Sequence, residues 1–475
     1  MLKRYDPSED VYPDKGTEQQ QNRPSKSSSP ITGSPEAELK TPGSAPASSL
    51  QRKKSPIDYR RLLAALGPGY LVAVGYMDPG NWVTDIAAGS RFAYSLLSVV
   101  FLANLMAMLL QSLCARLGIA TDRDLAQLCR HTYPKPVCLA LWAVCQIAIV
   151  ACDLAEVVGT AIALSLLFHI PLLAGICLTA FSTLVILWLQ KIGRRALELV
   201  VISLTLTVAF CLLTELIFAQ PSLGAVAAGF IPMPNLVSDP ERLYLAIGII
   251  GATVMPHNLY LHSALVRSSG YRKQESDTDE TEGKRRTLSY AVFDTCLALF
   301  FAFLVNAAIL ILAASAFHGR DIPLPIDLRD AYYLLTPLLG TSLASVLFGV
   351  ALLAAGQNST VTATLAGQVV MEGFLGLRLP PWAAQMTTRC AALVPALLVT
   401  AIAGDKALTE LLLLSQVVLS LQLPFAVIPL IHFCTQRRLM GSLTSPWWLT
   451  FPACFVALLL IFLNLKLVSD FMIDG

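Results

Sequence analysis

Long runs of apolar residues, separated by short polar segments, fill the chain from about residue 56 to its end. A helix that crosses the roughly 30 Å hydrocarbon core of a bilayer needs about 20 predominantly apolar residues. Eleven segments meet this requirement, so the pattern predicts an all-α polytopic membrane protein. The predicted spans are 62–90, 95–117, 137–167, 171–190, 197–219, 243–267, 288–316, 342–373, 389–403, 407–434 and 447–468.

The composition supports a membrane protein. Of the 475 residues, 55% are hydrophobic and 14% are charged, and the mean hydropathy is +0.62. This apolar excess is too large for a soluble core. The net charge is +2 and the aromatic residues are not interleaved with basic patches, so no nucleic-acid partner is expected. The cysteines form no C-x-x-C pair, so neither a zinc site nor a disulfide framework is predicted.

The residues before the first span have a different character. Residues 1–55 are rich in serine and proline and poor in large apolar residues, so they cannot form a core. We expect them to be a disordered cytoplasmic tail. Residues 56–475 then form the transmembrane domain, with spans one to five in 62–219, spans six to ten in 243–434 and span eleven in 447–468.

The basic residues predict the orientation, because cytoplasmic loops carry an excess of lysine and arginine. Alternate loops hold most of them, whereas the intervening loops hold only scattered charges. The N-terminus is therefore expected in the cytoplasm and, with eleven spans, the C-terminus outside, in the inner or plasma membrane. The basic set is Arg52, Lys53, Lys54, Arg60, Arg61, Arg123, Arg130, Lys135, Lys191, Arg194, Arg195, the cluster 267–286, Arg437 and Arg438.

The stretch VGYMDPGNW, 74–82, interrupts the first span with polar and helix-breaking residues. A carboxylate at the middle of a membrane helix costs about 2.5–3.5 kcal/mol on insertion scales, so Asp78 needs a compensating role. Pro79 lacks an N–H group and disfavours helical geometry at Asp78, and Gly80 tolerates irregular backbone. We expect a helix broken near the bilayer midplane, with the carbonyl groups around Gly75 and Tyr76 left without their helical donors.

A second interruption is expected in span six, where Pro256 follows Met255 and precedes His257. Five spans separate the two breaks, so the two halves have opposite topology. Broken helices at matching positions of inverted halves indicate the central site of a transporter. The alternative is that proline and glycine produce harmless kinks, as they often do in membrane helices. The polar residues beside both prolines favour a site.

The side chains at the breaks indicate a cation. Asp78 and Asn81 offer oxygen atoms, and the exposed carbonyls of Gly75 and Ala252 offer more. Met255 adds a thioether sulfur, which Mg²⁺ and Ca²⁺ do not prefer. A mixed set of oxygen and sulfur favours Mn²⁺ and Fe²⁺, with Co²⁺, Zn²⁺ and Cd²⁺ as competitors. Taken alone, Met255 is better explained by ordinary packing.

These residues also carry a resemblance to a known family. DPGN at 78–81 together with MPH at 255–257 resembles the signature pair of the Nramp family of divalent-metal transporters. The resemblance extends to CDLAE in span three and LSQV in span ten, and is greatest to the bacterial proton-coupled manganese and iron members. It implies a LeuT-like fold, with two inverted five-helix repeats, one extra helix, and helices 1 and 6 discontinuous.

The resemblance also assigns roles to residues. It implies that Asp78, Asn81 and Met255 bind the metal, joined in some states by the carbonyls of Gly75 and Ala252 and by the Gln416 side chain. It further implies a polar network that leads protons away from the metal, and a weaker candidate gate. The network consists of Asp78, His257, Asp153, Glu156 and Arg389, and the gate is Asn306.

The residues themselves give partial support for a proton route. Asp153 and Glu156 are three residues apart and share a helical face, where two carboxylates need water or a cation. Arg389 is a candidate partner for these carboxylates. The alternative to a proton route is therefore a buried salt bridge with a purely structural role. Histidine titrates near neutral pH and suits a relay, so His257 and His262 are both candidates for the proton pathway. His257 and His262 lie about 140° apart around a helix, so they are not expected to share one metal.

The sequence therefore predicts a proton-coupled importer of Mn²⁺ and Fe²⁺ that works by alternating access and as a monomer. Its partners are the metal ion, protons and the lipid bilayer, and it has no resident cofactor. The rivals are a related magnesium carrier, a sensor that has lost transport, and a membrane metalloenzyme. Met255 with Asp78 argues against the first, and the second would need a signalling domain. The third would need a cluster of histidine and carboxylate ligands with a general base.

Overall fold

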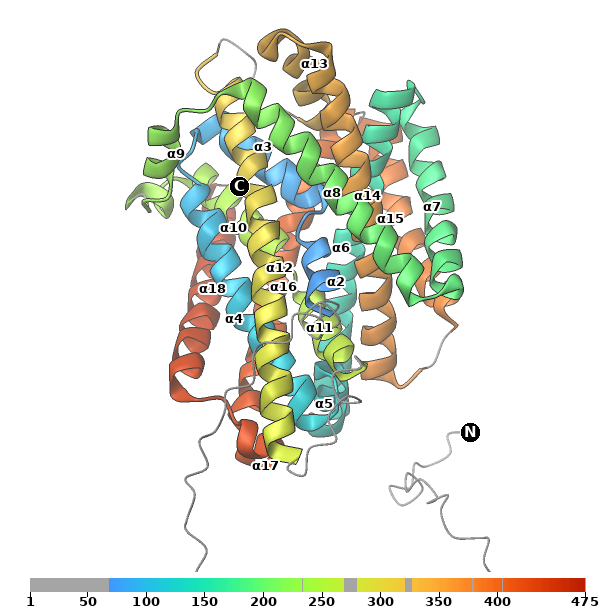
Figure 1. Ribbon diagram of the computed structural model, residues 1–475, viewed down its shortest axis with the longest axis vertical. Coiled ribbons are helices and arrows are strands. Elements are labelled where there is room, and N and C mark those ends of the chain that lie inside the picture. The colour runs from blue at the N-terminus through green and yellow to red at the C-terminus, as the bar shows by residue number, and fades with distance from the viewer. Residues whose placement is uncertain are drawn as a thin grey trace, which may run out of the picture. The chain divides into compact units, whose positions relative to one another are not determined.

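The computed structural model describes residues 68–232, 234–268, 280–320, 327–377, 380–403 and 405–474, which are almost entirely helical (Figure 1). They belong to one unit, Ile57–Gly475. The predicted tail, 1–55, and the first residues of the first predicted span, 62–67, lie outside the described residues. The helices are α2 Pro68–Gly75, α3 Pro79–Phe92, α4 Leu97–Thr121, α5 Leu125–Thr132, α6 Lys135–Phe168, α7 Leu172–Ile192, α8 Arg194–Ala219, α9 Leu223–Gly229, η1 Pro234–Leu236, α10 Pro240–Val254, α11 Pro256–Ser268, α12 Glu280–Phe317, α13 Leu328–Leu339, α14 Ser342–Leu375, α15 Pro381–Ala403, α16 Asp405–Thr435, α17 Arg437–Met440, η3 Gly441–Leu443 and α18 Trp447–Asp474.

The membrane spans agree with the hydrophobic pattern. Within the described residues, nine helical stretches are long and apolar enough to cross a bilayer, and α10 with α11 counts as one of them. The pair α2 and α3 and the helix α7 correspond to the two remaining predicted spans, one and four. Span nine is longer than predicted, because α15 begins at Pro381, and span seven begins at Glu280 on the polar side of its apolar run.

The first predicted break is present between α2 and α3. Hydrogen bonds from the backbone N–H of Tyr76 to Ala73 and of Met77 to Val74 close the end of α2. Asp78 then adopts an extended conformation, with φ −68° and ψ 163°, as expected before a proline. Its side chain caps α3, whose first residue is Pro79. Proline at this position loses no helical hydrogen bond, so the same residue that ends one helix starts the next.

The second predicted break separates α10 from α11 at Met255. This residue has φ +40° and ψ 101°, in the left-handed region that non-glycine residues rarely occupy. Such a conformation costs about 1–3 kcal/mol and persists only where the surroundings hold it. Pro256 begins α11, as Pro79 begins α3. The two spans are thus broken in the same way, a proline-started helix following a short irregular linker.

Unbroken helices surround the two broken ones. The long α12 packs against both α2 and α3, and α10 packs against α16 (Figure 1). α6 and α14, which are the third and the eighth spans, pack against each other. Close approach is permitted by glycine: a Cβ on Gly159 of α6 would lie 2.2 Å from Pro79 Cβ, so the start of α3 rests directly on α6.

Short helices that the hydrophobic pattern does not predict lie at the two ends of the bundle. α5 and α17 are at one end, and α9 and α13 are at the opposite end (Figure 1). The α5 and α17 end carries Arg130, Arg437 and Arg438, in agreement with the basic set of loops.

The helix α5 shows how such a short element is fixed. Asp124 Oδ1 accepts a 2.8 Å hydrogen bond from the Gln127 N–H, and Gln127 Oε1 accepts from the Asp124 N–H, which is a capping box. Arg267 of α11 lies 3.6 Å from Asp124 Oδ2. Burial raises the pKa of the Asp124 carboxyl, and the Gln127 hydrogen bond and Arg267 lower it by less. The cap therefore ties α5 to the second broken span.

Replacing Asp124 by alanine is expected to lower the free energy of unfolding by about 1 kcal/mol, the usual cost of losing an N-cap. Asp124→Asn keeps the cap and is expected to cost less. Because the pKa is raised in the folded state, the stabilisation from protonation is present at low pH and is lost as pH rises through the folded pKa. In thermal unfolding in detergent, the midpoint of wild type should therefore rise relative to that of Asp124→Asn as pH falls. A difference between the two midpoints that does not change with pH would contradict this.

Candidate metal-binding site

Asn81 joins the two helix breaks. Its side-chain Nδ2 donates to Asp78 Oδ1 at 2.8 Å and to the carbonyl of Ala252 at 3.0 Å. Its backbone N–H also donates to Asp78 Oδ1, at 2.9 Å. Asp78, Asn81 and Ala252 are between 0% and 1% exposed. Three of the residues predicted as ligands therefore lie together in a site closed to solvent.

The other end of the Asn81 amide is also held. Its Oδ1 accepts from Thr253 Oγ1 and from Asn306 Nδ2, both at 3.3 Å. Asn306 Nδ2 further donates to the carbonyl of Tyr76 at 2.9 Å. Asn306, expected as a gate, thus reaches the break of the first span from α12. The carbonyl that it contacts, that of Tyr76, is one of the two that the sequence predicts to be freed at this break.

Met255 lies on the other side of this gap. Its Sδ accepts a 3.4 Å hydrogen bond from Asn258 Nδ2. A Cβ on Gly75 would lie 2.7 Å from that same Nδ2. The end of α2 and the linker between α10 and α11 therefore meet around the Asn258 amide. Met255 as a whole is 0% exposed, so its thioether is buried.

Gln416 of α16 lies against both broken spans. A Cβ on Gly80 would lie 2.4 Å from the Gln416 side chain, and one on Gly251 would lie 2.1 Å from the Gln416 carbonyl. Glycine is needed at Gly251, where the α16 backbone leaves no room for a side chain, whereas a side chain at Gly80 would have to displace the Gln416 amide. Gln416 Nε2 donates to Ser415 Oγ at 2.8 Å, which leaves its Oε1 available.

The site has an excess of buried acceptor atoms. Asp78 Oδ2, Asn306 Oδ1 and Gln416 Oε1 have no hydrogen-bond partner among the described residues. A buried polar atom without a partner typically costs about 1–3 kcal/mol, so each one calls for a ligand or an ion. Within the described part of the chain, no three His, Cys, Asp or Glu side chains cluster to hold a metal. The available donors are one carboxylate with amide, carbonyl and thioether groups.

A second buried polar cluster surrounds Arg389. Its Nη1 lies 2.6 Å from Asp153 Oδ1 and 3.7 Å from Glu156 Oε2. Its Nε donates to Thr183 Oγ1 at 2.9 Å and its Nη2 to Thr360 Oγ1 at 3.3 Å. The guanidinium thereby links α6, α7, α14 and α15. Gly159, which touches Pro79, lies one turn beyond Glu156 on α6, so the cluster adjoins the first break.

The two histidines occupy different surroundings. His262 Nδ1 lies 2.8 Å from Gln111 Oε1, and Gln111 Nε2 donates to the Tyr76 hydroxyl at 2.8 Å. His262 Nε2 lies 3.3 Å from Thr295 Oγ1. His257 is buried, and its Nδ1 has no partner among the described residues. The separation expected from their spacing is thus matched by separate contacts.

Sequence reasoning missed several polar residues at or near the site. Thr253 and Asn258 flank the second break, and Asn258 could have been found as the fourth residue of MPHN. Gln111 is a polar residue inside an apolar span, which is a usable signal. Asp85 is buried in α3, and Glu215 is buried in α8 with neither carboxylate oxygen bonded within the described residues.

The chain matches known proteins over most of its length. A protein from Xanthomonas campestris pv. campestris named divalent metal cation transporter MntH is 56% identical over 411 residues, covering 86% of this chain and 91% of that protein. A protein of the same name from Brucella suis biovar 1 is 54% identical over 423 residues, covering 89% and 91%.

Solved structures agree. The manganese transporter of Eremococcus coleocola, in complex with an aromatic bis-isothiourea substituted compound, superposes with a TM-score of 0.79 at 37% identity and covers 87% of each chain. MhsT, a protein of LeuT-like fold, superposes with a TM-score of 0.54 at 15% identity, covering 83% of this chain and 98% of MhsT, which supports the fold alone. A model of the family described as natural resistance-associated macrophage protein-like matches residues 69–470, so the chain belongs to the Nramp family and has the LeuT-like fold.

Proposed function

We propose that this chain imports Mn²⁺ and Fe²⁺ by proton-coupled alternating access, with the ion held between the breaks of α2–α3 and α10–α11. The chain is a multi-pass membrane transporter of divalent metal cations and not an enzyme. The observation that carries the finer proposal is the unpaired acceptor set at the breaks, where Asp78 Oδ2 and Gln416 Oε1 are buried without a partner among the described residues. A cation satisfies such atoms, whereas an anion or an apolar substrate does not.

The ligand set would combine hard and soft donors. Asp78 supplies the charge, Asn81 and Gln416 supply amide oxygens, and Ala252 and Gly75 supply backbone carbonyls. Met255 supplies the sulfur that favours first-row transition ions over Mg²⁺ and Ca²⁺. The names of the relatives from Xanthomonas and Brucella, and of the Eremococcus structure, support a divalent metal and manganese in particular.

The proton route is proposed along the second cluster. Asp78, His257, Asp153, Glu156 and Arg389 would carry protons from the first break along α6, because Pro79 packs on Gly159 beside Glu156. His262 would belong to a side branch through Gln111, and Asn306 would act as a gate. We further propose a cytoplasmic N-terminus, an external C-terminus, residence in the inner or plasma membrane, and function as a monomer.

Uptake of ions by purified protein in liposomes tests the proposal. Met255→Ala is expected to keep weakened Mn²⁺ uptake while admitting Ca²⁺ or Mg²⁺, because only oxygen donors remain. Met371→Ala, at a buried methionine of α14 outside the site, controls for the cavity that truncation creates. Unchanged selectivity in Met255→Ala would remove the argument from sulfur. Wild-type uptake of Mg²⁺ in preference to Mn²⁺ would favour the magnesium carrier instead.

A further inference from the structure

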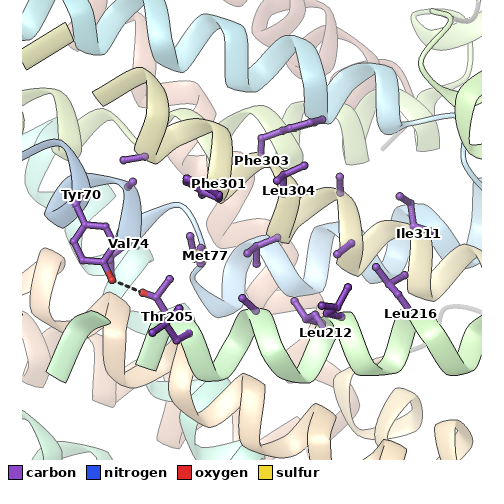
Figure 2. A pocket seen from close by; sticks show the side chains of 18 of the residues that line it. Tyr70, Val74, Met77, Thr205, Leu212, Leu216, Phe301, Phe303, Leu304 and Ile311 are labelled. Carbon is purple, nitrogen blue, oxygen red and sulfur yellow. Dashed lines mark hydrogen bonds between the residues drawn. The ribbon is translucent and has the colours of Figure 1, made fainter. Parts of the chain in front are cut away.

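A cavity of about 690 Å³ lies between α2, α8 and α12, away from the polar atoms of the metal site. We call it the α2–α8–α12 cavity; its lining comes from residues within 70–77 of α2 and the linker after it, 202–216 of α8 and 298–311 of α12, together with Phe230. Figure 2 shows these side chains in a row between the helices, from Tyr70 to Leu216. Its volume lies in the range of about 300–1,000 Å³ that is typical of small-molecule sites.

The lining of the cavity is apolar and offers an occupant no unpaired polar group. Among its described lining residues, Tyr70 and Thr205 carry the only side-chain oxygen atoms, and the Tyr70 hydroxyl donates to Thr205 Oγ1 at 2.9 Å (Figure 2). Thr205 also accepts from Asn358 Nδ2 at 2.9 Å and bonds the Val201 carbonyl at 3.0 Å. The polar groups therefore satisfy one another, and the remaining surface is hydrocarbon.

The cavity is open on the side that faces lipid. Leu206 and Leu213 of α8 are 64% and 61% exposed, and Phe301 of α12 is 55% exposed. On membrane helices, exposed side chains of this kind contact acyl chains. The lining of α8 runs over 14 residue steps, about 21 Å at 1.5 Å per residue. One leaflet of a roughly 30 Å hydrocarbon core is about 15 Å deep, so the cavity is long enough for an acyl chain that spans one leaflet.

We propose that this cavity binds one acyl chain of a membrane phospholipid, which packs against α2 and holds it beside α12. The cavity matches such a chain in polarity, in length and in access from the bilayer. Its wall is also continuous with the metal site, because Met77 adjoins Asp78, and because Val305 and Ala307 flank Asn306, which bonds the Tyr76 carbonyl. The influence of the lipid on transport rests on the proposed function; its binding does not.

The test uses the full chain in phosphatidylcholine vesicles doped with a phosphatidylcholine that carries a diazirine in one acyl chain. After photolysis, mass spectrometry should find adducts on peptides of α2, α8 and α12 at a several-fold higher yield than on the lipid-facing surface of α18. Ala209→Phe and Ala308→Phe each place a ring in the cavity and are expected to lower that yield several-fold. Ala174→Phe, at an exposed alanine of α7 outside the cavity, is the matched control and should leave it unchanged.

Two results would overturn the proposal: an adduct yield in the cavity no higher than on α18, or a yield that both filling variants leave intact. Cross-links between two protein copies at these peptides would also overturn it, because the occupant would then be a second chain. None of these measurements requires metal movement. Loss of the adducts with retained Mn²⁺ uptake would therefore leave the proposed function standing, and adducts in a protein that fails to bind Mn²⁺ would leave the lipid site standing.

Discussion

Asp78→Asn is expected to reduce uptake of Mn²⁺ into liposomes to the level of protein-free vesicles. Asparagine keeps an oxygen that can cap α3 and accept from Asn81, so the fold of the break is retained. What is lost is the only carboxylate in the proposed ligand set. Removing a residue that merely supports a ligand typically lowers metal affinity by about 10–100-fold, and removal of the charged ligand itself should exceed this. Calorimetric titration with Mn²⁺ measures the loss directly.

The chain offers a matched control for this substitution. Asp239 caps α10, accepts from the backbone N–H groups of Glu241 and Arg242, and precedes a proline at the first helical position, as Asp78 does. Asp239→Asn therefore makes the same chemical change at the same structural position, outside the site. It should leave Mn²⁺ binding and uptake close to wild type. Binding of Mn²⁺ by Asp78→Asn with unchanged affinity would contradict the proposed site.

Arg389→Met is expected to destabilise the protein severely. The substitution leaves Asp153 and Glu156 buried without their cation, and breaking a buried ion pair by removing one partner costs about 3–5 kcal/mol. It also frees the hydroxyls of Thr183 and Thr360, so four helices lose a shared contact. Thermal unfolding in detergent should show a large fall in the midpoint, whereas Arg437→Met, at an exposed arginine of α17, should show almost none.

A triple variant separates structural support from proton transfer. Arg389→Met with Asp153→Asn and Glu156→Gln removes all three charges, so no buried charge is left without its partner. We expect the triple variant to recover most of the lost midpoint. If the cluster carries protons, its Mn²⁺ uptake will have lost the pH dependence of wild type. If the triple variant regains its unfolding midpoint and its Mn²⁺ uptake keeps the pH dependence of wild type, the role of the cluster is structural only.

The helix breaks could be predicted because their causes are local. Pro79 and Pro256 end helices by their own chemistry, and Asp78 in an apolar run requires a reason to be there. Both breaks are where the sequence places them. The register between helices has no such local signal. That Asn306 is the residue that reaches the Tyr76 carbonyl depends on how α12 packs against α2, which no single segment encodes.

The same distinction between local signals and long-range packing applies to other features. The spacing of Asp124 and Gln127 is a capping-box pattern, and it would have identified α5 from sequence. The contact of His262 with Gln111 joins positions 151 residues apart and needs the folded chain. The α2–α8–α12 cavity is equally invisible in sequence, because apolar residues that line a cavity and those that fill a core follow the same pattern.

The hydrogen bonds of Asn81 Nδ2 have a consequence for the protein when no metal ion is bound. It donates to Asp78 Oδ1 and to the Ala252 carbonyl, two oxygen atoms of the proposed ligand set. An N–H group carries partial positive charge, so the amide acts as a placeholder for the dication. In the proposed site, an arriving ion would displace it and turn its Oδ1 inward, which would also release Thr253 and Asn306. In the proposed alternating-access cycle, the emptied carrier would return with these two oxygens already occupied, which would limit the leak of unwanted cations on that step.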